Sequence, residues 1–167
     1  MLQKIYNVLF ICTGNSARSI MAEAIVNHLG HDRFHAFSAG SRPRGTVHPM
    51  TLEVLRGQGY DIAGARSKGW SEFALPDAPQ MDFVFTVCDQ AAGEACPVWP
   101  GQPITAHWGF TDPAAATGSP AEQLKIFKAV EHEIANRIRL FLNLPVEKLD
   151  RLSLQTHVRD LGQQRDA

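Results

Sequence analysis

The sequence has few cysteines, no excess of charge of either sign and no long apolar run. Its three cysteines among 167 residues are an odd number, unlike the disulfide framework of a small secreted protein. Sixteen basic and 17 acidic side chains leave a formal charge of −1, so no global field favours nucleic acid or an anionic membrane. The apolar stretch Val8–Cys12 is far shorter than the roughly 18 residues of a membrane span. No apolar core of a secretory signal follows Met1–Tyr6. We therefore expect a soluble cytoplasmic protein without nucleic-acid or membrane partners.

Patterns typical of strands and helices alternate along the chain. Continuous apolar runs rich in β-branched and aromatic residues predict buried strands. Apolar residues at helical spacing predict helices, and a capping box at Ser119–Glu122 marks the start of a long one. The alternation predicts an α/β fold with a parallel sheet covered on both faces. We expect one domain over residues 1–144 and an extension over 145–167 that forms a short helix with a frayed end. The predicted strands are Lys4–Cys12, Phe34–Ala39, Asp82–Cys88 and Pro103–Ala106, and the predicted shorter helices are Ser19–Leu29 and Met50–Arg56.

The loop after the first predicted strand has the composition of an oxyanion site. In an open parallel sheet, ligands bind beyond the carboxyl ends of the strands, where the N–H groups of the next helix point. Gly14 and Asn15 tolerate positive φ, which turns successive amides toward an anion, and Arg18 adds a planar pair of donors. In that field we expect the Cys12 thiol to ionise near or below neutral pH and to act as a nucleophile. The expected oxyanion-binding residues are Thr13, Gly14, Asn15, Ser16, Ala17, Arg18 and Ser19, and the Ser19 hydroxyl could also donate to the Cys12 sulfur.

Four segments of the chain carry a family resemblance. The segments VLFICTGNSARS, FSAGS, FTVC and HWGFTDP resemble those of the low-molecular-weight tyrosine phosphatase superfamily, and within it the thioredoxin-coupled arsenate reductases. The likeness runs from about Ile5 to Leu142. It implies a flavodoxin-like, four-stranded parallel sheet flanked by helices. It also implies that Cys12 attacks a tetrahedral oxyanion cradled by residues 13–18.

Two further cysteines distinguish a reductase from a phosphatase. The ends of central strands lie side by side in a parallel sheet, so Cys88 is expected to open onto the crevice of Cys12. The resemblance implies that Cys88 attacks the Cys12 adduct, releasing arsenite, and that Cys96 then attacks Cys88. The resulting Cys88–Cys96 disulfide would be reduced by an external thiol, with no bound cofactor. Thioredoxin is the favoured reductant, and glutaredoxin with glutathione or another small thiol remains open. A second reading is that the three thiols bind a thiophilic metal or metalloid.

The predicted general acid is Asp112, which would protonate the departing oxygen. In the phosphatase branch the Asp-Pro pair is followed by tyrosine, whereas here Ala114 follows, and Ser41–Arg44 contains no aromatic side chain. A small inorganic anion such as arsenate needs no aromatic wall, so both absences favour arsenate. A tyrosine phosphatase is the alternative, and residual phosphatase activity is expected in either branch. The arginines of Ser41–Arg44 either steer anions or are simply solvated.

One position departs from the family pattern. In some relatives an asparagine, a glutamate, a serine and an aspartate hold a potassium ion behind the loop. Asn15, Glu23 and Ser38 match the first three, but the fourth position is Lys68. An ammonium cannot ligate a cation, but it can take the place of one against a carboxylate. We therefore hypothesise that Lys68 replaces the ion, and we expect no metal site, including at His28, His31 and His35.

Overall fold

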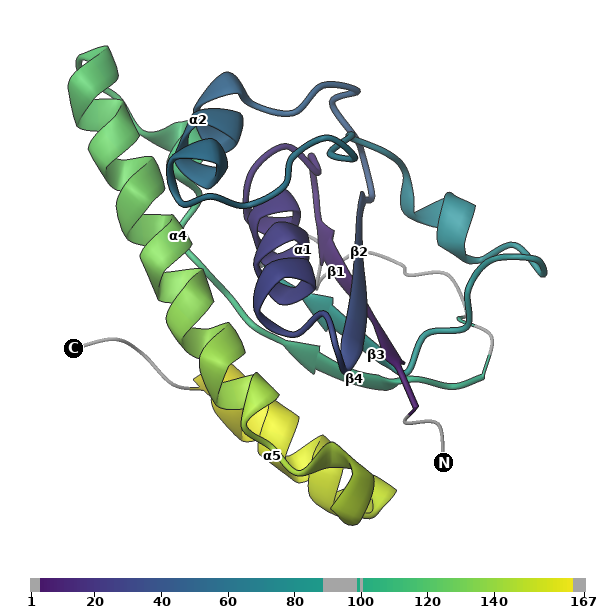
Figure 1. Ribbon diagram of the computed structural model, residues 1–167. Coiled ribbons are helices and arrows are strands. Elements are labelled where there is room, and N and C mark those ends of the chain that lie inside the picture. Colours follow the sequence, from purple (N-terminus) through teal and green to yellow (C-terminus); the bar gives the residue numbers. More distant parts are fainter. Residues whose placement is uncertain (1–3, 89–98, 100, 164–167) are drawn as a thin grey trace.

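A computed structural model describes residues 4–88, 99 and 101–163 of the chain. Its sheet has four parallel strands in the order β2-β1-β3-β4 (Figure 1). The central strand β1 pairs with β2 on one side and with β3 on the other. Residues 8–11 of β1 are fully buried, because both faces of the sheet are covered. The strands are β1 (Tyr6–Cys12), β2 (Phe34–Gly40), β3 (Phe83–Thr86) and β4 (Ile104–His107).

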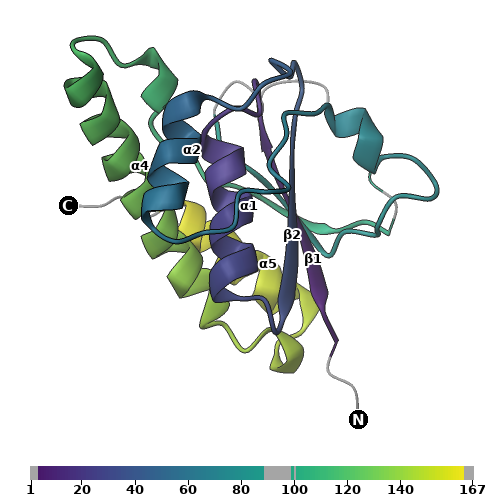
Figure 2. The ribbon, with the colours of Figure 1, turned by 45° about the horizontal axis from the view of Figure 1, so that its top comes forward.

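Helices connect the strands and pack against one another beside the sheet (Figure 2). The long helix α4 begins at the predicted capping box, where the Ser119 hydroxyl accepts from the Glu122 N–H. It packs against α1 and α2. This arrangement confirms the predicted α/β fold of one four-stranded parallel sheet flanked by helices. The helices are α1 (Arg18–Leu29), α2 (Pro49–Gly57), α4 (Pro120–Leu142) and α5 (Arg151–Gln163), and the short 3-10 turns are η1 (Trp70–Phe73), η2 (Pro113–Ala115) and η3 (Val146–Lys148).

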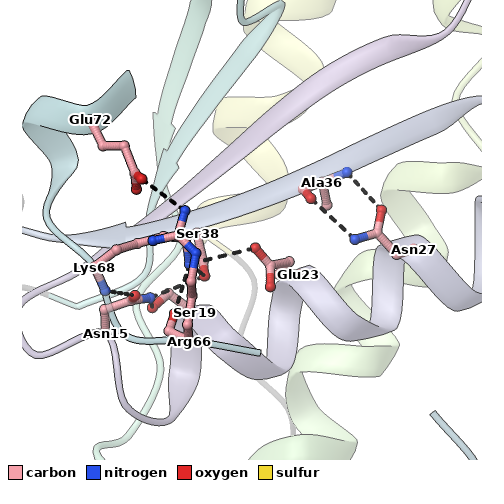
Figure 3. A network of polar contacts seen from close by, with 9 residues as sticks. All are labelled: Asn15, Ser19, Glu23, Asn27, Ala36, Ser38, Arg66, Lys68 and Glu72. Carbon is pink, nitrogen blue, oxygen red and sulfur yellow. Dashed lines mark hydrogen bonds and ion pairs between the residues drawn. The ribbon is translucent and has the colours of Figure 1, made fainter. Parts of the chain in front are cut away.

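Backbone groups on the outer edge of each outer strand have partners from a neighbouring helix. On β2, the Asn27 side chain accepts from the Ala36 N–H at 2.8 Å and donates to its carbonyl at 3.1 Å, as a neighbouring strand would (Figure 3). On β4, helix α5 takes the corresponding place, and Gln155 Nε2 donates to the Thr105 carbonyl at 2.7 Å. Among the residues described, no helix is both long and apolar enough to cross a membrane.

Candidate functional site

The two described cysteines meet at the carboxyl edge of the sheet. Cys12 ends β1 and Cys88 follows β3, and these strands are neighbours. Both side chains are buried. They line a cavity of about 490 Å³ together with the oxyanion loop, Arg18 and Asp112. The parallel sheet thus brings together four of the five residues predicted to react, and the fifth, Cys96, lies outside the described residues.

Asn15 fixes the shape of the oxyanion loop. It is fully buried and has a positive φ of 47°, a conformation that asparagine tolerates better than most residues, whereas Gly14 keeps a negative φ. The Asn15 Nδ2 donates to the hydroxyls of Ser19 at 2.8 Å and Ser38 at 3.1 Å. Its Oδ1 accepts from the Lys68 N–H at 2.9 Å. One side chain therefore ties the loop to α1, to β2 and to the segment before η1.

Two segments that the sequence did not place beside the loop hold it through its carbonyl groups. The segment after β2 runs beside the loop, where Arg42 N–H donates to the Thr13 carbonyl and Arg44 N–H to the Gly14 carbonyl, both at 2.9 Å. From α2, the Thr51 hydroxyl donates to the Ser16 carbonyl at 3.0 Å. Arg42 and Arg44 also line the cavity. These segments occupy the loop carbonyls, whereas the Gly14 N–H is directed toward the Cys12 sulfur.

The Arg18 guanidinium and Asp112 face each other across the cavity. Arg18 is the first residue of α1, and its Nη1 donates to the Phe110 carbonyl at 3.1 Å. Its Nη2 lies 3.6 Å from the Asp112 carboxylate. The Nε of Arg18 is buried and has no hydrogen-bond partner among the residues described. Asp112 is positioned by its own turn, because its Oδ1 accepts from the Ala114 N–H at 3.0 Å. The cavity therefore offers an unsatisfied cationic donor beside an acid.

The environment of Cys12 differs from the one expected from the sequence. A hydrogen bond to Cys88 raises the pKa of the Cys12 thiol, and burial and the charge of Cys88 raise it further. The Arg18 guanidinium and the Gly14 N–H lower that pKa without reversing the rise. The direction of this shift is opposite to the one expected from the sequence, because a second sulfur adjoins Cys12. The Cys88 sulfur also contacts the Thr13 hydroxyl at 3.3 Å.

Behind the loop, the Lys68 ammonium lies among the residues predicted to support it (Figure 3). Its Nζ is 3.9 Å from the Glu23 carboxylate, and it donates to the Ser38 hydroxyl at 3.4 Å and to the Arg66 carbonyl at 2.8 Å. Burial is the largest influence on both charges: it lowers the pKa of Lys68 and raises that of Glu23. The charge of each partner offsets part of that shift. Sequence positions up to 53 residues apart thus form one cluster.

A cavity larger than the cysteine site lies on the far side of this cluster. It measures about 680 Å³ and is lined by residues of α1, β2 and the segment 61–79, including Glu23 and Lys68. Its lining contains neither described cysteine. In the part of the chain that the structure describes, no group of three or more histidine, cysteine or carboxylate side chains is placed to hold a metal ion. The reactive groups therefore gather in the smaller cavity.

Comparison with known proteins gives consistent matches. The profile of the low molecular weight phosphotyrosine protein phosphatase family matches residues 7–153. An arsenate reductase of Bacillus licheniformis is 40% identical over 136 residues, which cover 80% of this chain and 93% of that protein. The structure of an arsenate reductase in the phosphate-binding state has a TM-score of 0.65 at 28% identity, covering 83% of this chain and 97% of the other. A thioredoxin-dependent arsenate reductase of Corynebacterium glutamicum has a TM-score of 0.57 at 27% identity, covering 84% of this chain and 65% of the other.

Proposed function

The chain belongs to the low molecular weight phosphotyrosine protein phosphatase family, and from that premise we propose that it is an arsenate reductase. The observation that carries the proposal is the second thiol in the oxyanion site. Hydrolysis of a phosphate ester needs one cysteine and water, whereas reduction of arsenate needs a second thiol to accept the adduct. Cys88 lines the same cavity as Cys12, and the two sulfurs interact. Relatives that are 37–40% identical and carry the name arsenate reductase support the same choice.

The first step uses the oxyanion loop, Arg18 and Asp112. Arsenate binds to the N–H groups of residues 13–18 and to the guanidinium, which has a free buried donor at Nε. Cys12, as the thiolate, attacks arsenic, an arsenic–sulfur bond forms, and one oxygen leaves as water with the proton from Asp112. Before this attack the pair of thiols must lose one proton. The Arg18 charge and the Gly14 N–H favour placing the resulting negative charge on Cys12.

The second step transfers two electrons to arsenic. Cys88 attacks the Cys12 sulfur, a disulfide forms, and the electron pair of the arsenic–sulfur bond stays on arsenic, which leaves as arsenite. Cys96 then attacks Cys88 and frees Cys12, and the Cys88–Cys96 disulfide is reduced by an external dithiol. We favour thioredoxin, because one solved relative is a thioredoxin-dependent arsenate reductase. We place the reaction in the cytoplasm, where thiols are kept reduced.

We assign Lys68 the role of an internal cation behind the loop. Its ammonium contacts Glu23 and Ser38, while its backbone N–H holds Asn15, so it stabilises the residue that shapes the loop. The side chain is 9% exposed, and its ammonium occupies the position beside the Glu23 carboxylate that an external cation would take. In this proposal the loop needs no bound metal.

Phosphatase activity is the second candidate, and the family itself favours it. The loop holds phosphate and arsenate alike, since the two anions have the same charge and shape. Against a dedicated tyrosine phosphatase, Ala114 lines the cavity where the phosphatase branch has tyrosine. Phe110 does line the cavity, but its carbonyl accepts from Arg18 and its ring lies under the Arg137 guanidinium. We therefore expect hydrolysis of aryl phosphates to be a weak side activity.

The decisive experiment is arsenate-dependent NADPH oxidation with thioredoxin and thioredoxin reductase. We expect turnover in the unmodified protein and its loss in Cys88→Ser and Cys96→Ser. Hydrolysis of an aryl phosphate by the same preparations serves as the control, because it needs Cys12 and the loop but not the relay. Turnover with glutathione and glutaredoxin that survives Cys96→Ser would change the recycling route. Absence of arsenate turnover with every reductant, beside fast aryl phosphate hydrolysis, would refute the proposal.

A further inference from the structure

Most of helix α5 lies beyond the residues that the family profile matches. The profile ends at residue 153, whereas α5 spans Arg151–Gln163. The helix nevertheless packs closely on the sheet, with Leu154, Val158 and Leu161 buried. Its neighbour is β4, the strand that leads into the segment with Asp112 (Figure 1). Because α5 packs against this strand, it is placed where it can affect the position of Asp112.

The contacts of α5 follow the backbone of β4 and the residues around it. At the start of the helix, Arg151 donates to the Gln102 carbonyl at 2.6 Å. One turn later, Gln155 donates to the Thr105 carbonyl at 2.7 Å. Beyond the end of β4, the Trp108 indole N–H donates to the Val158 carbonyl of the helix at 2.9 Å. The helix is thus held along the whole length of the strand.

Trp108 is the innermost of these contacts. It is fully buried and stacks on Phe85 of β3, with the ring centres 4.2 Å apart. Phe141 of α4 meets it edge-on at 5.7 Å. The indole N–H would be buried without a partner if Val158 did not accept it, which would destabilise this packing. Helix α5 therefore satisfies the single polar atom of this side chain.

Gly162, near the end of α5, permits the helix to approach His107 and Trp108 closely. A Cβ at this position would lie 2.2 Å from the His107 carbonyl oxygen and 3.0 Å from Trp108 Cδ1. Any other residue would push the helix away from His107 and Trp108. Helices generally disfavour glycine relative to alanine, and the close contact explains why a glycine stands at this position of α5.

A short path connects Trp108 to the acid. The backbone N–H of Trp108 donates to the Thr86 carbonyl at 2.7 Å, and the backbone N–H of Phe110 donates to the Val87 carbonyl at 3.3 Å. The Phe110 carbonyl in turn accepts from Arg18, whose Nη2 lies 3.6 Å from Asp112. Only three residues lie between Trp108 and Asp112, so a shift of the indole would reach the carboxylate over a very short stretch of chain.

We propose that α5 positions the general acid, with Trp108 and Gly162 as positioning residues for Asp112. The helix fixes the indole through the Val158 carbonyl, and the indole fixes where the 108–112 segment leaves the sheet. This inference rests on the proposed function, in which Asp112 protonates the departing oxygen. It gives the extension a role in catalysis beyond covering the edge of β4.

The test is a double-mutant cycle on arsenate turnover with the full chain. We expect Asp112→Asn to lower kcat/KM about 100-fold, as loss of a general acid does. We expect Gly162→Ala, and separately Trp108→Phe, to lower it about tenfold, a part of that acid contribution. In the Asp112→Asn background, each of these two substitutions should lower kcat/KM less than about twofold, because there is no acid left to position. Leu152→Ala is the control on the same helix, since that side chain is 76% exposed.

The outcomes separate the positioning role from a purely structural one. Thermal unfolding of each variant shows whether it is folded at the assay temperature. Equal losses in the two backgrounds would mean that the substitutions only reduce the active fraction, and would overturn the inference. An unchanged rate in both Gly162→Ala and Trp108→Phe would overturn it as well. A normal rate in the single variant Asp112→Asn would refute the assignment of Asp112 as the acid, and the role proposed for α5 would fall with it. That single variant therefore distinguishes failure of the proposed function from failure of this inference.

Discussion

Replacing Gly40 with alanine should displace the oxyanion loop. Gly40 ends β2 opposite Cys12, and a Cβ there would lie 2.5 Å from the Thr13 carbonyl oxygen and 3.0 Å from Asn15 Cβ. Carbon and carbonyl oxygen normally stay about 3.3 Å apart, so the loop must move by about 0.8 Å. A misplacement of about 1 Å near reacting groups costs about 100-fold in rate. We therefore expect Gly40→Ala to lower kcat/KM for arsenate about 30- to 100-fold, with a loss of stability of about 1–3 kcal/mol.

The assay is arsenate-dependent NADPH oxidation, read beside thermal unfolding of the same variant. Gly57→Ala is the matched control, because a Cβ at Gly57 meets no atom within 4 Å and its φ is not positive. We expect that control to keep full turnover and to gain up to about 1 kcal/mol of stability. A Gly40→Ala protein with normal turnover and normal unfolding temperature would show that the loop yields without cost, and the reasoning would be wrong.

Three further changes test the electrostatics of the site. Cys88→Ala removes the largest cause of the raised pKa of Cys12, so that pKa should fall. Alkylation of Cys12 by iodoacetamide at pH 7 should therefore become faster, by about tenfold for each unit by which the pKa falls. A slower alkylation would contradict this reasoning. Arsenate turnover of the unmodified protein should be equal in sodium and potassium at constant ionic strength, and Lys68→Met should lower it. A several-fold rise with potassium in the unmodified protein would refute the role of Lys68 as the internal cation. Arg42→Ala and Arg44→Ala should raise KM for arsenate several-fold at low salt with kcat unchanged, and this difference should shrink near 1 M salt, where charges are screened beyond about 3 Å. A rise in KM that is independent of salt would exclude electrostatic steering of arsenate by these two arginines.

Local patterns in the sequence were enough to predict the fold. The apolar run ending at Cys12 and the run ending near Cys88 are strands because their side chains are buried on both faces. The capping box at Ser119 starts α4 because its hydrogen bonds are made within one turn. Parallel order then brings the ends of β1 and β3 together, which is why the meeting of Cys12 and Cys88 could also be predicted.

Other features depend on contacts between distant segments, which no local pattern encodes. The raised pKa of Cys12 comes chiefly from a hydrogen bond to Cys88, and the sequence indicates only that the two strands end nearby. The close approach of Gly162 to His107 requires knowing that α5 lies along β4. The amphipathic pattern of residues 151–163 predicts a helix with an apolar face, but any exposed apolar surface would have satisfied that face. The family resemblance could not supply this contact either, because its profile ends at residue 153.

The two exchanges of the proposed relay make different demands on the backbone. The first requires the sulfurs of Cys12 and Cys88, which line the same cavity, to approach to about 2.05 Å. The second requires Cys88 to turn away from Cys12. Val87 is held on both sides, since its N–H donates to the Ile11 carbonyl at 2.8 Å and its carbonyl accepts from Phe110 at 3.3 Å. Any backbone movement in the second exchange must therefore begin after Val87. The oxyanion loop is anchored separately through Asn15 and Lys68, so it can keep its shape while Cys88 changes partners.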